Sequence, residues 1–417
     1  MSEFKIAEAA KQAKKGAIVV AQLTTTEKNQ LLSDMAQAIE ESIENILEEN
    51  IKDIEAGRAK GLSEAMLDRL LLTEQRVTDI AEAIREIVSL TDPVGDIANL
   101  SLRPNGMQVG KMRIPLGVIA MIYEARPNVT AEAAALCLKS GNAVVLRGGS
   151  EAIHSNIALA TCLHKVLEKH GVNKNVVTVI PDTSRSVIEE LLKQRDSIDL
   201  VIPRGGEGLI RYVTENSQIP VIQHFKGVCH LYIDKFADLQ KAVDILVNGK
   251  TQRPSACNAI ETLVVHKDIA DAFLPLAAEA LKPANVKIHA CESSQNYFEE
   301  AELATEDDFH AEYLTQEIAV KVVDSFDNAI SHIHEYSSDH TEVIVTQDTS
   351  RSQKFVRAIN SSVVMVNASS RFSDGGQLGL GSEIGISTSK LHAYGPMGLS
   401  SLTTEKFVVL GDGQVRT

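Results

Sequence analysis

The chain is long, acidic and of average hydrophobicity. Its 417 residues are more than one hydrophobic core usually holds, and 44% hydrophobic with 23% charged residues is typical of globular proteins, so we expect two or three domains. The formal net charge of −15 argues against nucleic acid or an anionic membrane as the main partner, because both attract basic surfaces. The five cysteines are odd in number and lack a Cys-x-x-Cys pair, which favours reduced thiols and a cytoplasmic location.

The first 90 residues have the periodicity of amphipathic helices. Apolar residues recur at three- and four-residue steps between Leu31 and Ile54, and a second such stretch runs from Ser63 to Leu90, where Asp92-Pro93 ends it. The N-terminus predicts a helix start and not a signal peptide, and no apolar run approaches the roughly 20 residues of a membrane-spanning helix. From Gln108 to Glu124 the pattern becomes extended.

Short apolar strands and helices then alternate, which predicts α/β architecture with parallel, doubly wound sheets. A first set precedes Cys257 and a second set follows it, so we expect the cysteine at the junction of two α/β halves, in a cleft where small molecules usually bind. The final run Phe407–Leu410 predicts a late strand that adds to another sheet or subunit. The strands expected are 142–146, 176–180, 198–202, 262–266, 318–323, 342–345 and 363–366.

Cys257 is the candidate nucleophile. A short polar loop with Arg253, Pro254 and Ser255 delivers the thiol to the start of a β-branched run. A reactive cysteine needs access and a cationic neighbour, because the thiolate is the attacking species. The alternative from local sequence alone is a small buried apolar residue, which is the usual role of a cysteine without a disulfide.

Two glycine turns are candidate phosphate sites. Arg147-Gly148-Gly149-Ser150 follows one predicted strand and Arg204-Gly205-Gly206 follows another. Each turn places backbone N–H groups and a guanidinium where a helix begins, an arrangement that can hold phosphate, although such glycines are often purely structural. The Gly-x-Gly-x-x-Gly fingerprint of dinucleotide-binding folds is missing after the predicted strands.

Other suggestive residues do not form motifs. Gly249-Lys250-Thr251 ends like a P-loop, but Asp244 occupies the position of the required upstream glycine. His332, His334 and His340 lack the helical spacing of a zinc site and lie in a polar segment, so we expect surface histidines and no metal site.

Six motifs occur in order along the chain: Pro115–Val118, Tyr123–Thr130, Ser140–Gly149, Ile202–Gly206, Thr251–Cys257 and Gly395–Leu399. Taken together, these motifs resemble the γ-glutamyl phosphate reductases, a branch of the aldehyde dehydrogenase superfamily, over essentially the whole chain. That superfamily binds its nicotinamide cofactor without the glycine fingerprint, so the resemblance accounts for the absence of the fingerprint.

The resemblance implies an aldehyde dehydrogenase-like fold of two doubly wound domains with a small oligomerisation extension. Residues 1–226 would form the NADPH-binding domain, with an extended oligomerisation segment at about 107–122. Residues 227–385 would form the catalytic domain that carries Cys257, and residues 386–417 a C-terminal return and oligomerisation segment.

The resemblance also assigns catalytic and cofactor residues. Cys257 matches the nucleophile, and Asn128 matches the amide that holds the oxyanion with the cysteine backbone N–H. The residues implied at the cofactor are Arg147, Gly148, Gly149, Ser150, Arg204, Gly205, Gly206 and Glu312. Relatives that prefer NAD often carry an acid where this chain has Ser150, so the resemblance implies NADPH. Glu312 matches the glutamate that holds the nicotinamide ribose.

Substrate contacts are expected from Arg126, Arg253, Ser255 and Arg371, because arginine matches both carboxylate and phosphate. A structural ion pair is the alternative for each arginine. Hydrolytic relatives carry a general-base glutamate in the segment that corresponds to Pro220–Cys229, where this chain has no acid and His224 lies at the approximate position.

The activity implied is NADPH-dependent reduction of L-glutamyl 5-phosphate to L-glutamate 5-semialdehyde and phosphate through a cysteine thioester, a step of proline biosynthesis. The resemblance further implies a cytoplasmic homo-oligomer, a dimer or tetramer, with a possible transient contact to glutamate 5-kinase. Two alternatives remain at this point: an oxidising aldehyde dehydrogenase of the same fold, and a cysteine hydrolase or acyltransferase that uses Cys257 and His224.

Overall fold

The computed structural model describes residues 4–416 and divides them into two units. Unit 1 contains the described residues up to Gln223 together with Leu380–Gly385 and the segment from Met397 onward, and unit 2 contains His224–Gly379 and Ile386–Pro396. The chain therefore returns to unit 1 twice after building unit 2. Two short strands, β14 (Gly385–Ser387) and β15 (Gly395–Met397), lie where it passes from one unit to the other.

Unit 1 begins with helices, as the periodicity predicts. The stretch expected from Ser63 to Leu90 is two helices, because the chain turns at Leu71–Leu72 and a new helix starts after Thr73, whose hydroxyl accepts a hydrogen bond from the Arg76 N–H. The N-terminal helices are α1 (Ile6–Val20), α2 (Thr25–Glu40), α3 (Ile43–Ala59), α4 (Glu64–Leu70) and α5 (Glu74–Ser89).

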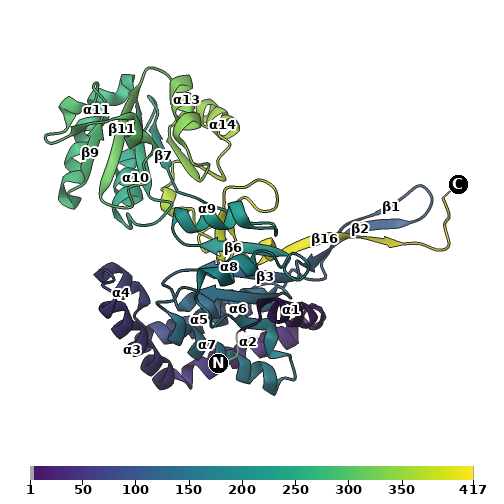
Figure 1. Ribbon diagram of the computed structural model, residues 1–417. Helices are drawn as coiled ribbons and strands as arrows, with labels where there is room; N and C mark the ends of the chain where they lie inside the picture. Colours follow the sequence, from purple (N-terminus) through teal and green to yellow (C-terminus); the bar gives the residue numbers. More distant parts are fainter. Residues whose placement is uncertain (1–3, 417) are drawn as a thin grey trace. The chain divides into compact units, whose positions relative to one another are not determined.

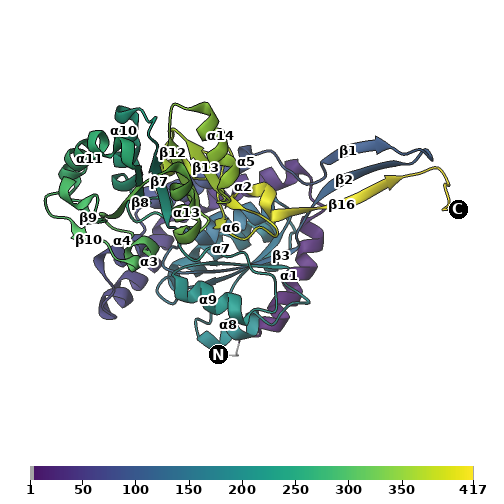
Figure 2. The same cartoon turned by 90° about the horizontal axis from the view of Figure 1, so that it is seen from above.

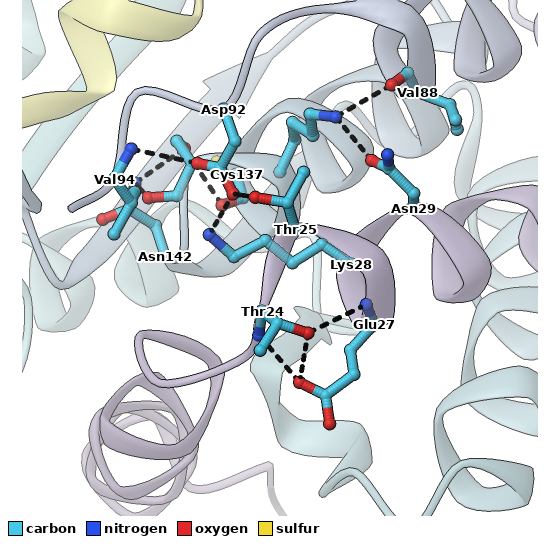
Figure 3. A network of polar contacts seen from close by, with 12 residues as sticks. Thr24, Thr25, Glu27, Lys28, Asn29, Val88, Asp92, Val94, Cys137 and Asn142 are labelled. Atoms are coloured by element: carbon cyan, nitrogen blue, oxygen red, sulfur yellow. Dashed lines mark hydrogen bonds and ion pairs between the residues drawn. The ribbon is translucent and has the colours of Figure 1, made fainter. Parts of the chain in front are cut away.

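A buried ion pair fixes helix α2 within unit 1 (Figure 3). The Lys28 ammonium lies 2.9 Å from the Asp92 carboxylate, and the Lys28 side chain is 1% exposed. At its N-terminus, α2 has a capping box in which the Thr24 and Glu27 side chains bind each other's backbone N–H groups. A buried charge is tolerated only when it is paired, so Lys28 links this helix to the segment that follows α5.

The core of unit 1 is a four-stranded parallel sheet in the order β5-β4-β3-β6. Figure 2 shows α6 and α7 on one face of this sheet and α8 and α9 on the other. The order reverses at β3, because the chain builds β4 and β5 on one side of it and returns to place β6 on the other. The elements are β3 (Val118–Tyr123), α6 (Asn128–Lys139), β4 (Ala143–Gly148), α7 (Ile153–Lys169), β5 (Val177–Val179), α8 (Arg185–Leu191), β6 (Leu200–Arg204) and α9 (Glu207–Asn216).

A three-stranded antiparallel sheet extends from unit 1 as a ribbon (Figure 1). It consists of β1 (Ile97–Leu102), β2 (Gln108–Pro115) and β16 (Thr403–Leu410), with β2 in the middle. The late strand thus pairs with a sheet edge, as predicted. The extended segment expected at 107–122 is in fact two strands with different partners, because the fully buried strand β3 belongs to the parallel sheet.

Unit 2 holds a seven-stranded parallel sheet in the order β10-β9-β11-β8-β7-β12-β13. The four strands predicted after Cys257 are confirmed, but the second set begins before the cysteine, with β7 and α10. Cys257 therefore lies inside unit 2, and the prediction that it lies at the junction of two α/β sets is wrong. The elements are β7 (Cys229–Ile233), α10 (Leu239–Thr251), β8 (Ile260–His266), α11 (Lys267–Leu281), β9 (Lys287–Ala290), β10 (Glu302–Leu303), α12 (Glu306–His310), β11 (Glu317–Val323), α13 (Phe326–Tyr336), β12 (Thr341–Val345), α14 (Thr349–Ala358) and β13 (Val363–Val366).

Each central strand of this sheet contributes to two cores. Leu231 and Ile233 pack into a cluster with residues of α10 and α11, whereas Tyr232 between them packs with residues of α13 and α14. Successive side chains of a strand point to opposite faces, so a strand covered on both faces is apolar throughout. The near-continuous apolar runs of the sequence are therefore the signature of helices on both sides. The predicted aldehyde dehydrogenase-like α/β class is confirmed.

Candidate active site

Cys257 lies in a turn of unit 2, between the end of α10 and the start of β8 at Ile260. The Ala256 N–H donates to the Arg253 carbonyl at 3.1 Å, which closes the turn, and Cys257 is half-buried. The turn thus holds the thiol at the edge of the sheet where β8 begins. The expectation of a short loop that leads the thiol into a strand is confirmed.

A buried ion pair joins the two ends of this turn. The Lys250 ammonium lies 2.5 Å from the Glu261 carboxylate, and both side chains are almost completely buried. Burial raises the pKa of Glu261 and lowers the pKa of Lys250, since each loses water that would solvate its charge. The residue that resembled a P-loop lysine is therefore an anchor at the base of the cysteine turn.

Glu312 reaches the same turn through Gly227. Its carboxylate accepts a hydrogen bond of 2.7 Å from the Gly227 N–H, and Gly227 lies against the backbone of Cys257. A Cβ atom at position 227 would collide with the Cys257 carbonyl, so only glycine allows this approach. The structure thus brings Glu312 near the nucleophile, within unit 2.

Two histidines lie beside Cys257. His224 precedes β7 and His340 precedes β12, and their ring centroids are 4.9 Å apart. One ligand-type atom from each of His224, Cys257 and His340 lies within 4.8 Å of the others. Burial lowers the pKa of His224 to about 4 and that of His340 to about 3, so both rings are neutral at neutral pH.

The prediction of surface histidines is wrong for His332 and His340, which are buried, and right for His334, which is exposed. His340 was missed because its polar neighbours in sequence resemble a loop. The signal that could have found it is topological: residues that immediately precede parallel strands share one edge of the sheet. Cys257, His224 and His340 all precede strands of unit 2.

The candidate substrate residues of unit 2 surround the same turn. Arg371 donates through Nε to the Gln252 side-chain oxygen at 2.7 Å. Burial lowers the pKa of Arg371 and the nearby charge of Arg253 lowers it further, whereas Cys257 acts in the opposite direction. Arg253 and Ser255 are exposed. Arg371 therefore lies close enough to interact electrostatically with both Arg253 and Cys257.

In unit 1, Arg147 lies at the carboxyl end of β4 and is 9% exposed. Its guanidinium donates to the backbone carbonyl of Thr183, while its Nε has no partner among the described residues. Side chains at Gly148 and Gly149 would collide with Asn156 and Glu151, so close packing accounts for both glycines. Ser150 is exposed in the turn that follows this strand.

Arg204-Gly205-Gly206 lies at the carboxyl end of β6. The Arg204 guanidinium donates to the Ile384 carbonyl at 3.1 Å. The Gly206 N–H donates to the Glu124 carboxylate at 3.1 Å, and a side chain at Gly205 would collide with the same carboxylate. Both predicted cofactor arginines thus also support the backbone of unit 1.

Side-chain carboxylates lie at the N-termini of the helices that follow the two predicted phosphate-binding turns. The Asp53 carboxylate accepts hydrogen bonds from the backbone N–H groups of His154 and Ser155, in the first turn of α7. The Glu124 carboxylate likewise accepts a hydrogen bond from the backbone N–H of Gly206, the residue that precedes α9. An anion is stabilised at a helix N-terminus, so these acids stabilise the two helices. Sequence reasoning missed both, since neither is near its helix in sequence.

Asn128 is the first residue of α6. Its side-chain amide donates to the Glu132 carboxyl group at 3.0 Å, one helical turn further on. Burial raises the pKa of Glu132, whereas the Asn128 hydrogen bond and the charges of Arg204 and Arg126 lower it. Arg126 is exposed in the turn before α6. Asn128 and Arg126 therefore belong to one polar group in unit 1.

Among residues 4–416, no helix is both long and apolar enough to cross a membrane. Residues 1–296 match the aldehyde dehydrogenase family model. A protein of Colwellia psychrerythraea named γ-glutamyl phosphate reductase is 74% identical over 417 residues, which is 100% of both chains. One of the same name from Idiomarina loihiensis is 59% identical over 416 residues, again covering 100% of both chains.

Solved structures of related proteins have the same fold. The crystal structure of γ-glutamyl phosphate reductase from Thermotoga maritima has a TM-score of 0.98 and 44% identity, and the match covers 99% of this chain and 100% of that one. An acetylating aldehyde dehydrogenase from Geobacillus thermoglucosidasius shares the fold, with a TM-score of 0.71, 17% identity and coverage of 99% and 97%. The chain belongs to the aldehyde dehydrogenase family and, within it, to the γ-glutamyl phosphate reductases.

Proposed function

We propose that this chain reduces L-glutamyl 5-phosphate to L-glutamate 5-semialdehyde and phosphate with NADPH, through a thioester on Cys257, in the second step of proline biosynthesis from glutamate. The observation that carries the proposal is the full-length 74% identity to a relative with the corresponding name. The half-buried cysteine turn supports it, because Arg371 lies close enough to interact electrostatically with both Cys257 and Arg253.

In the first step, Cys257 Sγ attacks the acyl carbon of the substrate and phosphate leaves. Nearby cations favour the thiolate over the thiol, and the thiolate is the reactive form. We assign Arg126, Arg253, Ser255 and Arg371 to the two anionic ends of the substrate, its phosphate and its α-carboxylate. We assign the Asn128 amide and the Cys257 backbone N–H to the developing oxyanion, whose stabilisation is usually the largest single contribution of such a site.

In the second step, the thioester is reduced to a thiohemiacetal, which collapses to the aldehyde and restores the Cys257 thiolate. A bound nicotinamide cofactor supplies the hydride for this step. The residues proposed to hold it are Arg147, Gly148, Gly149, Ser150, Arg204, Gly205, Gly206 and Glu312. Two features fit that assignment: the Nε–H of Arg147 has no partner among residues 4–416, and Ser150 is exposed in the turn that follows β4.

The preference for NADPH rests on Ser150. A serine at this position leaves room for the 2′-phosphate, which a carboxylate would repel. Glu151, Asp182 and Glu124 do lie near Arg147, and their charges raise its pKa against the larger, opposite effect of burial. Glu151 and Glu124 are engaged by the backbone N–H groups of Ala125 and Gly206, so these acids have local roles.

His224 is not expected to promote hydrolysis of the thioester. Hydrolysis of an acyl-enzyme needs a base that takes a proton from water, and catalytic efficiency is best when the pKa of that base is near the working pH. The pKa of His224, lowered to about 4 by burial, makes it a weak base at neutral pH. We therefore favour the reductase over a cysteine hydrolase that would use the same two residues.

We further propose a cytoplasmic homo-oligomer, a dimer or a tetramer. The ribbon of β1, β2 and β16 supports assembly, because large apolar side chains that are exposed together often mark a protein–protein interface. The exposed large apolar side chains of the ribbon are Ile97, Leu100, Leu102, Phe407, Val409 and Leu410. A transient contact with glutamate 5-kinase also stays a prediction.

The test of function is the reverse reaction. Purified protein is incubated with pyrroline-5-carboxylate, which is in equilibrium with the semialdehyde, together with NADP⁺ and inorganic phosphate. The proposal expects NADPH to appear only when phosphate is present. An oxidising dehydrogenase would reduce NADP⁺ without phosphate, and a hydrolase or acyltransferase would form no NADPH at all.

A further inference from the structure

The side chains of His224, Cys257 and His340 form a cluster within unit 2. One nitrogen or sulfur atom from each residue lies within 4.8 Å of the other two. The three come from separate loops that precede β7, β8 and β12, so the fold brings them together and no local motif does. The mechanism proposed above uses the thiol but neither imidazole as a partner.

A hydrogen-bond chain fixes the tautomer of His340. The Thr341 hydroxyl donates its only proton to the Ser373 hydroxyl at 2.8 Å. In its other hydrogen bond, of 2.8 Å to His340 Nδ1, the Thr341 oxygen must therefore accept, and the ring N–H donates. Nδ1 of His340 is therefore the protonated nitrogen, and Nε2 carries a lone pair. Metal-binding histidines are typically oriented in this way, by a hydrogen bond from the nitrogen that does not bind the metal.

Two ring nitrogens of the cluster are buried and have no hydrogen-bond partner among residues 4–416. They are Nδ1 of His224 and Nε2 of His340. A buried polar atom without a partner destabilises a protein, so such atoms indicate a missing ligand. The tautomer of His340 already leaves the lone pair of its Nε2 available to a ligand. Neutral imidazole is the form that binds metal ions.

We propose that His224, Cys257 and His340 bind a zinc ion that reversibly blocks the nucleophile. One thiolate and two imidazoles are ligands for zinc and not for magnesium or calcium, which select oxygen. Tetrahedral zinc would separate these atoms by about 3.4–3.6 Å, given bonds of about 2.3 Å to sulfur and about 2.0–2.1 Å to nitrogen, so the widest pair must close by about 1 Å. Small side-chain rotations supply that movement, and solvent takes the fourth position.

Binding involves no redox change. The Sγ–H bond of Cys257 breaks, its proton passes to solvent, and the sulfur lone pair forms the bond to zinc. That lone pair is then no longer available to attack an acyl phosphate. The inhibitory part of this inference rests on the proposed function, whereas the binding part does not.

Zinc binding is measured on the reduced, full-length protein by competition with a chromophoric zinc chelator, and Co²⁺ serves as a spectroscopic probe. We expect one equivalent of zinc and, with Co²⁺, a thiolate-to-metal charge-transfer band. The variants Cys257→Ser, His224→Gln and His340→Asn should each weaken binding by at least about tenfold, because even partners outside the first coordination shell contribute that much. Circular dichroism checks that each variant is folded.

Cys291→Ser and His334→Asn are the matched controls. Cys291 is a second half-buried thiol and His334 an exposed histidine, and neither belongs to the cluster. Both controls should bind zinc as the parent protein does. Absence of a stoichiometric site, or a site that survives Cys257→Ser, would overturn the metal assignment while leaving the proposed function intact.

Turnover is followed in the same titration. Zinc should abolish phosphate-dependent NADP⁺ reduction in proportion to occupancy, and a chelator should restore it. Full turnover with zinc bound through Cys257 would overturn the inhibitory role and the assignment of Cys257 as nucleophile together. The two failures are therefore distinguishable.

Discussion

Gly227 lies so close to the carbonyl group of Cys257 that no side chain fits between them. The Gly227 N–H is also held by Glu312, so one residue links the cysteine turn to the loop before β11. The nucleophile is thus positioned by backbone packing from one side and by the Lys250–Glu261 ion pair at the base of its turn.

Gly227→Ala should displace this turn. The new methyl group must push the backbone of Cys257 away, and overpacking of this kind costs about 1–3 kcal/mol of stability. We expect kcat/KM to fall by at least about tenfold, since small misplacements of reacting groups are costly. Gly208→Ala is the control, because a Cβ atom there would meet nothing within 4 Å among residues 4–416 apart from its chain neighbours and the backbone of its own helix. Equal activity of Gly227→Ala and the parent protein would show that the close approach is unimportant.

Asn128→Ala should lower kcat by about a hundredfold or more, the usual effect of removing an oxyanion donor, with little change in cofactor affinity. The Asn128 amide also donates to Glu132, so loss of that contact needs its own control. Glu132→Gln changes the contact and keeps the Asn128 amide. If Glu132→Gln lowers kcat as much as Asn128→Ala, the role of Asn128 is structural, and a rise in KM alone would also reject the oxyanion role.

Ser150→Glu should move cofactor preference from NADPH towards NADH. A carboxylate at this exposed position would repel the 2′-phosphate by an amount on the order of 1–3 kcal/mol, and could accept a hydrogen bond from the free 2′-hydroxyl of NADH. The measurement is the ratio of kcat/KM for the two cofactors. Ser101→Glu, on β1, makes the same charge change outside the parallel sheet. An unchanged ratio in Ser150→Glu would remove Arg147 and Ser150 from the cofactor assignment.

Acid should destabilise the protein partly through His340. Burial lowers its pKa from 6.5 to about 3 in the folded state. Between these values the unfolded state binds the extra proton, so the stability that neutral His340 contributes is present above about pH 6.5 and is lost as the pH falls. From pH 7 to pH 5 this loss is roughly 2 kcal/mol.

Urea unfolding of the parent protein and His340→Asn at pH 7 and pH 5 measures this contribution. Asparagine does not titrate, so the variant should lose less stability on acidification, by that amount. Parallel losses in the two proteins would mean that His340 is not buried and neutral as described.

Much of the fold follows from local patterns. The strands at Ala143–Gly148 and Val363–Val366 were expected because each is a short β-branched run followed or preceded by a helix. The pairing of β16 with β2 could not be predicted, since antiparallel partners far apart in sequence leave no local signal. Strand β7 was missed because polar residues before Cys229 obscure its start.

The site shows the same division. Cys257 was found because its turn carries charge, proline and a following strand, all of which are local. His340 was taken for a surface residue because Ser337, Ser338 and Asp339 precede it, although tertiary packing buries its ring. The main-chain contacts of Arg147 and Arg204 also depend on residues distant in sequence. In each case, the feature that could not be predicted from the sequence is a contact between segments that are far apart along the chain.

The most direct test of the account is the turnover of Cys257→Ser in phosphate-dependent NADP⁺ reduction. A serine hydroxyl has no thiolate-like population at neutral pH, and no strong base is assigned to activate it, so activity should fall by at least about a thousandfold. The variant should still fold and bind NADPH, as circular dichroism and quenching of cofactor fluorescence would show. Activity within tenfold of the parent protein would contradict covalent catalysis by Cys257.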